Sequence, residues 1–83
     1  MNSAQSALHA AADAHAAACA QLELAQRDAE AAWDRLQASP DTIEYQIDWN
    51  LARRHEAAAL AKVTEAERRY IRAGGYALTD PEE

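Results

Sequence analysis

Apolar residues recur every seven positions through the first half of the chain. One position of the repeat holds leucine, histidine or alanine, at Leu8, His15, Leu22, Ala29 and Leu36. The position four residues before each of these is always alanine, at Ala4, Ala11, Ala18, Ala25 and Ala32. Residues at alternating steps of three and four share one face of a helix, and a strict seven-residue repeat supercoils that helix against a partner. The alanines predict a close approach, because no long side chain separates the two backbones.

A second seam of the same kind runs through the other half of the chain. It combines alanines with larger side chains, at Tyr45, Trp49, Ala52, Glu56, Ala59, Val63, Ala66, Tyr70 and Ala73. Only a short segment around Pro40 separates the seams, and so short a connection makes neighbouring helices antiparallel. The pattern predicts an all-α antiparallel two-helix hairpin, coiled-coil-like, as a single domain over residues 1–83. We expect helices at about 3–38 and 41–73, a turn at 39–41 and a short tail at 74–83.

The segment between the seams contains two alternative signals for a helix start. Ser39 can cap the second helix with Pro40 at its first position, or Asp41 can cap it with Glu44 as the reciprocal carboxylate. At the other end, the helix is expected to stop at Gly74-Gly75, where a glycine can adopt positive φ and close the helix.

The second helix carries more apolar surface than one partner helix can cover. Successive residues of a helix are rotated by about 100° around its axis, and on this spacing a further apolar line lies well away from the seam. It consists of Ile43, Ile47, Leu51, Ala58 and Ala61. We expect this surplus to meet another chain, most simply in a homodimer that forms a four-helix bundle. It serves either self-association or a heterologous partner.

Two tryptophans lie on either side of the predicted turn, at roughly matching heights. Trp33 and Trp49 are expected to build the wide end of the core. Tryptophan is enriched where binding energy concentrates, so any part of this pair that stays exposed is a candidate contact.

Composition narrows the range of functions. The net charge is −6, whereas nucleic-acid-binding proteins concentrate positive charge. The arginines of the second helix form two clusters, Arg53 with Arg54, and Arg68 and Arg69 with Arg72. We interpret the second cluster as a complement to the negative end of the helix, with Glu65 placed to pair with Arg69. The alternative interpretation is that this second cluster binds an acidic partner or a phosphate.

No residue pattern predicts an enzyme, a cofactor or a metal. His15 and Cys19 share a helical face and offer half of a zinc site, but typical structural zinc sequences contain closely spaced pairs of ligands. The only cysteine excludes an intramolecular disulfide. Charged residues interrupt the alanine-rich run before it could span a bilayer, so we expect a soluble, cytoplasmic protein.

These observations favour a small protein-binding module, which recognises another protein through the Ile43, Ile47 and Leu51 line or the tryptophan end. Inhibitors or adaptors that occlude a larger protein, such as phage-type regulators and anti-defence proteins, are often of this size. The alternatives are a purely structural, self-assembling coiled coil and a weak nucleic-acid-binding protein that uses the arginines of the second helix.

Overall fold

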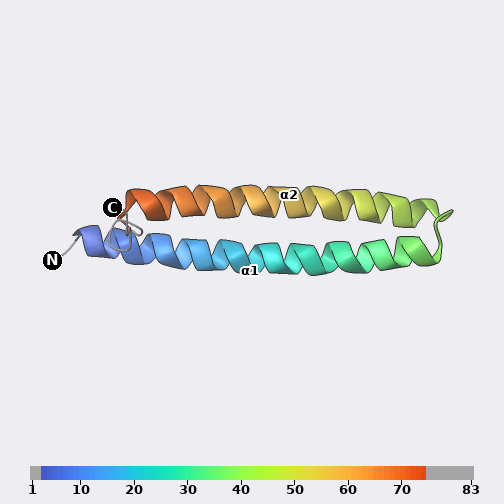
Figure 1. Ribbon diagram of the computed structural model, residues 1–83, viewed down its shortest axis with the longest axis horizontal. Coiled ribbons are helices and arrows are strands. Elements are labelled where there is room, and N and C mark those ends of the chain that lie inside the picture. The colour runs from blue at the N-terminus through green and yellow to red at the C-terminus, as the bar shows by residue number, and fades with distance from the viewer. Residues whose placement is uncertain (1–2, 75–83) are drawn as a thin grey trace, which may run out of the picture.

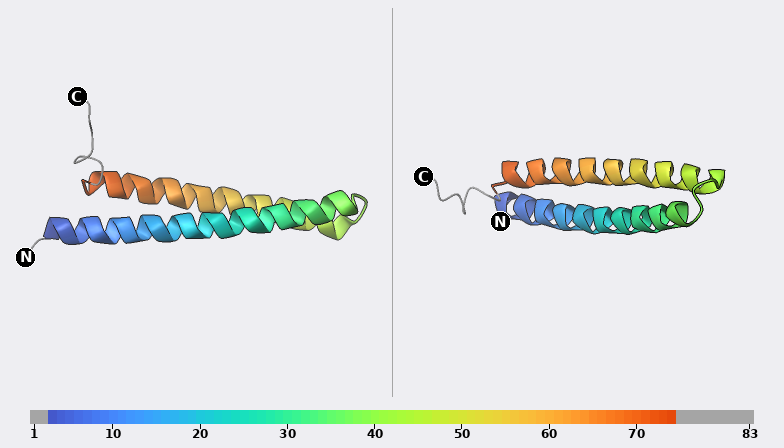
Figure 2. Two further views of the ribbon diagram at one scale, coloured as in Figure 1. Left: turned by 60° about the horizontal axis from the view of Figure 1, so that its bottom comes forward. Right: turned by 45° about the vertical axis from the view of Figure 1, so that its right-hand side comes forward.

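The computed structural model describes residues 3–74, which form two long antiparallel helices (Figure 1). Helix α1 spans Ser3–Ala38 and helix α2 spans Ile43–Arg72. The helices lie side by side along their length and form a rod 59 Å long. A turned view shows them crossing at a shallow angle, as a seven-residue repeat requires (Figure 2). The predicted all-α hairpin is therefore confirmed.

The buried residues of the hairpin are all alanines. Every seam position from Leu8 to Leu36 in α1 and from Tyr45 to Ala73 at the end of α2 is buried or half-buried. The buried members are Ala29, Ala32, Ala52, Ala59 and Ala66. Alanine favours the helix because its side chain loses no entropy, but each buried methyl group contributes only about 0.8 kcal/mol. The interface is close and regular, and its hydrophobic stabilisation is small.

The turn between the helices differs from both predicted capping arrangements. The N-cap of α2 is Thr42, so neither Ser39 nor Asp41 takes that position, and α2 begins at Ile43 rather than at about 41. The Thr42 backbone N–H donates to the Ser39 carbonyl at 3.1 Å, and the hydroxyls of the two residues are 2.6 Å apart. Pro40 follows Ser39 in this turn, at the position where its fixed φ favours a β-turn. Ser39 and Asp41, the two predicted caps, therefore belong to the turn and not to the end of α2.

Hydrogen bonds connect the turn to the first turns of α2 and also close the C-terminal end of that helix. The Gln46 side-chain amide donates to the Pro40 carbonyl at 2.9 Å. After Arg72, the Ala73 N–H donates to the Arg69 carbonyl at 3.0 Å, and Gly74 adopts a φ of +97°. The predicted glycine stop is therefore confirmed at Gly74, and the rest of the predicted tail, residues 75–83, lies outside the described residues.

Candidate protein-binding site

The hairpin leaves most of its large apolar side chains in contact with solvent. Seven of them are exposed although the buried positions hold only alanine: Leu24, Trp33, Ile43, Ile47, Leu51, Leu60 and Ile71. The seam contributes to this exposure, because its alanines let the helices lie close together and only the larger side chains on the seam itself are partly covered. Contiguous exposed apolar surface commonly marks a site of protein association.

The first turns of α2 carry the apolar line that the sequence singled out. Ile43 is 65% exposed, Ile47 is 57% exposed and Leu51 is 48% exposed. Ile47 is two residues before Trp49 and five before Ala52, which places it on the side of α2 that faces away from α1. Within the hairpin, α1 therefore leaves this line uncovered.

Trp33 and Trp49 meet across the two helices close to the turn. Their ring centroids are 4.9 Å apart and the rings are inclined at 47°. Trp49 is half-buried and packs against the cluster of Ala29, Ala32 and Ala52. Trp33 lies beside the seam and remains 42% exposed. The Trp49 ring thus packs into the wide end of the interface, and the Trp33 ring is exposed to solvent.

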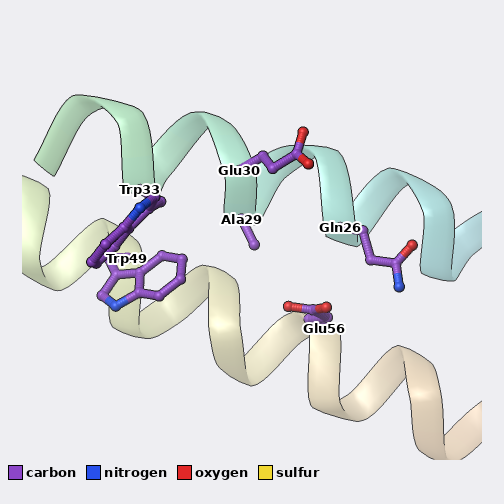
Figure 3. Close-up of a pocket in the computed structure, with 6 residues that line it drawn as sticks. All are labelled: Gln26, Ala29, Glu30, Trp33, Trp49 and Glu56. Atoms are coloured by element: carbon purple, nitrogen blue, oxygen red, sulfur yellow. The ribbon is translucent and has the colours of Figure 1, made fainter. Parts of the chain in front are cut away.

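An open notch runs from the tryptophan pair along the interface. Its lining consists of Gln26, Ala29, Glu30, Trp33, Trp49 and Glu56. Figure 3 shows the two indoles at one end of the notch, the Gln26 and Glu56 side chains at the other, and the small Ala29 side chain between them. We call this hollow the tryptophan notch. It combines aromatic faces with carboxylates, which is the chemistry of a site for cations.

Glu56 occupies a seam position that would suit an apolar side chain. It is half-buried between the buried Ala52 and Ala59, and the corresponding α2 positions one repeat away hold Trp49 and Val63. Within residues 3–74, no ion pair or side-chain hydrogen bond engages its carboxylate. The carboxylate reaches the open hollow instead, so this seam position lacks the hydrophobic burial that an apolar side chain would contribute.

The arginines do not gather into one surface. Arg68, Arg69 and Arg72 are exposed near the end of α2, and Arg69 Nε lies 3.4 Å from Glu65 Oε2, which confirms the ion pair expected from the sequence. Arg53 lies near the other end of the rod, with its guanidinium carbon 5.6 Å from the centroid of the Trp49 ring. The two clusters are separated by nearly half of α2.

His15 and Cys19 lie together on the seam, and the distance from His15 Nε2 to Cys19 Sγ is 3.8 Å. The His15 ring also stacks on Tyr70, with centroids 6.1 Å apart and an angle of 11° between the planes. Among the described residues, no group of three or more histidine, cysteine, aspartate or glutamate side chains is placed to hold a metal ion. The histidine joins the two helices as an aromatic packing partner.

The sequence pattern does not predict every exposed apolar residue of the hairpin. Leu24, Leu60 and Ile71 belong to neither predicted apolar line, and each is about half exposed. For Glu56, the sequence predicts a place on the seam but no binding role. The signal for Glu56 was present in the sequence, since a charged residue interrupts an otherwise apolar or alanine position of the repeat.

On the opposite side of the hairpin, Leu24 and Leu51 line two adjoining hollows that share Asp28 and His55. Lys62 lies at one end of this surface and Arg35 at the other. Apolar groups alternate there with charges of both signs, in contrast to the tryptophan notch, whose ionisable lining residues are both glutamates.

Neither described helix contains an apolar stretch long enough to cross a membrane. Comparisons with protein-family models, with curated proteins and with solved structures find no match to this chain.

Proposed function

We propose that this chain is a small protein-binding module, of the inhibitor or adaptor type, that contacts another protein with the turn end of the hairpin. The observation that carries the proposal is that the fully buried positions hold only alanine among the described residues, while seven tryptophan, isoleucine and leucine side chains are exposed. Burying a leucine or isoleucine side chain is worth about 1.5–3 kcal/mol, so the exposed set represents substantial unused association energy. On sequence grounds we place the module in the cytoplasm.

The turn end concentrates the residues suited to binding. Ile43 and Ile47 lie exposed in the first turns of α2, and the Trp33–Trp49 pair lies at the interface near the same end of the rod. The turn is fixed by the Ser39–Thr42 and Gln46–Pro40 contacts, so little order would have to be gained on binding. Preorganised apolar and aromatic groups of this kind are typical of the residues that dominate binding energy.

A comparison of two variants tests this assignment. Ile47→Asp introduces a carboxylate into the exposed apolar line, whereas Thr64→Asp adds the same charge at an exposed polar position of α2 far from the turn end. Capture of a partner from a lysate of the source organism, measured by quantitative mass spectrometry, should fall at least about tenfold for Ile47→Asp and stay unchanged for Thr64→Asp. Circular dichroism of each variant establishes that the hairpin is intact. Equal capture by the two variants would refute a role for the turn end.

Self-association is the second candidate, and the surface around Leu24 and Leu51 favours it. Its charged residues include both signs, with Asp28 in both hollows, Arg35 toward the turn end and Lys62 at the far end. Such a surface can pair with a second copy of itself, because an antiparallel arrangement can place opposite charges next to each other. A homodimer would give the four-helix bundle expected from the sequence and would still leave the tryptophan notch accessible.

A further inference from the structure

The tryptophan notch has an aromatic end that suits a positive charge. Indole rings attract cations through their negative faces, and this attraction is stronger for tryptophan than for tyrosine or phenylalanine. The chain already uses it, because the Arg53 guanidinium lies over Trp49. The inclined Trp33 ring, 42% exposed, presents further aromatic surface to an incoming group.

The other end of the notch supplies negative charge. Glu56 extends into the space between the helices, opposite Gln26 (Figure 3). Glu30 also belongs to the lining, with its carboxylate pointing away from α2 in Figure 3, and no lysine or arginine is part of the lining. Both carboxylates lack an ion-pair partner within the described part of the chain. The floor at this point is the methyl group of Ala29, which leaves room for a side chain to enter.

An apolar occupant would fit only half of this lining. It would cover the indoles favourably but would also remove water from the unpaired Glu56 carboxylate, which costs free energy. A lysine or arginine side chain avoids that cost, because its methylene stem can lie on the rings while its charged end meets the Glu56 carboxylate. The net charge of −6 further favours the approach of a basic surface.

We infer that the tryptophan notch binds a basic side chain, lysine or arginine, of a partner protein, with Trp33 and Trp49 holding the stem and Glu56 the charge. The inference rests on the proposed protein-binding function and deepens it by naming the chemistry of the partner. Glu56 is thereby explained as a binding residue kept at a structural position.

The inference can be tested with peptide probes that differ in one side chain. Three acetylated and amidated pentapeptides carry lysine, arginine or norleucine at the centre, norleucine having the length of the lysine stem without its charge. Binding is followed by the shifts of the two indole N–H signals in NMR spectra at about 0.15 M ionic strength. Saturable binding of the lysine or arginine peptide, at least about tenfold tighter than that of the norleucine peptide, is expected. Equal binding of all three, or no saturation by any, would overturn the inference.

A matched pair of charge-removing variants separates a local contact from general attraction. Glu56→Gln keeps the size of the side chain in the notch, and Glu44→Gln removes the same charge from the exposed first turn of α2. Affinity for the basic peptides should fall about tenfold in Glu56→Gln and less than about twofold in Glu44→Gln. Equal losses would mean that only net charge matters, and the notch would be excluded as the site.

Capture of the partner distinguishes failure of this inference from failure of the proposed function. If Glu56→Gln retains full capture while Ile47→Asp loses it, the module binds its partner without a cation in the notch, and only the inference fails. If both variants lose capture while Glu44→Gln retains it, the two proposals stand together.

Discussion

Glu56 shows how a single residue can set function against stability in this hairpin. The carboxylate sits half-buried on the seam between Ala52 and Ala59, where the rest of the repeat places apolar groups. No ion pair engages it in residues 3–74. A charged side chain that takes a seam position suited to an apolar group and lines the tryptophan notch is expected to be retained for binding.

Replacement of Glu56 by leucine should therefore stabilise the hairpin. The apolar side chain would lie at the seam beside Ala52 and Ala59 and bury more apolar area there, for a gain of about 1 kcal/mol. In a domain of this size, that gain raises Tm by about 4–8 °C, measurable by circular dichroism. Glu23→Leu removes the same charge from an exposed position of α1 and should change Tm by no more than about 2 °C. A lower Tm for Glu56→Leu would show that the carboxylate contributes to stability.

At the scale of the helices, the alanine seam fixes the separation of α1 and α2. Ala32 is only 2% exposed and lies with Ala29 and Ala52 at the closest part of the interface. A methyl group is the largest side chain that such a contact accommodates without moving the backbone. The sequence repeat predicted this arrangement correctly because every seam alanine follows the same seven-residue spacing.

Close packing at the seam predicts that leucine affects stability differently at two neighbouring alanines. Ala32→Leu forces extra volume into the interface and should destabilise the hairpin by about 1–3 kcal/mol. Ala31→Leu places the same side chain at the adjacent exposed position and should change stability by less than about 0.5 kcal/mol. Urea unfolding followed by the circular dichroism signal at 222 nm measures both. Similar midpoints for the two variants would contradict a close-packed alanine contact.

The ends of the helices were less predictable than their faces. Ser39, Asp41 and Thr42 are all competent capping residues within four positions, and local propensity does not choose among them. The structure selects Thr42 because the Ser39 carbonyl accepts its N–H and so closes a turn that brings α2 back along α1. The return path of the chain, rather than the strength of any cap, decided where α2 begins.

At the scale of the whole molecule, the rod has a large surface and a thin interior. Its buried side chains are alanines, which bury little area, and its larger apolar groups face solvent. Two-helix proteins with so little core usually gain stability by association. The hairpin is therefore expected to be more stable in an assembly than alone.

Association should make the unfolding temperature depend on protein concentration. For a homodimer, a hundredfold increase in concentration should raise Tm by several degrees, because the folded state binds a second copy and the unfolded state does not. Circular dichroism between about 1 and 100 μM measures the shift, and light scattering measures the mass. Leu51→Asp, at the surface that favours self-pairing, should reduce the dependence, and Asn50→Asp should preserve it. A Tm that is constant over this range, together with the mass of a monomer, would refute the homodimer.

The sequence by itself determined the two helices, their antiparallel packing and the line of contact between them, because helical periodicity and a short connection leave no alternative arrangement. It also placed Ile43, Ile47 and Leu51 outside that line, and the structure leaves all three exposed. The sequence likewise placed Trp33 and Trp49 at matching heights, and their rings lie 4.9 Å apart. Only the tertiary structure decided that His15 stacks on Tyr70 and that Glu56 shares one notch with the indoles. Periodicity fixes the face on which a residue lies, but the height at which distant residues meet depends on the conformation of the turn, which periodicity does not specify.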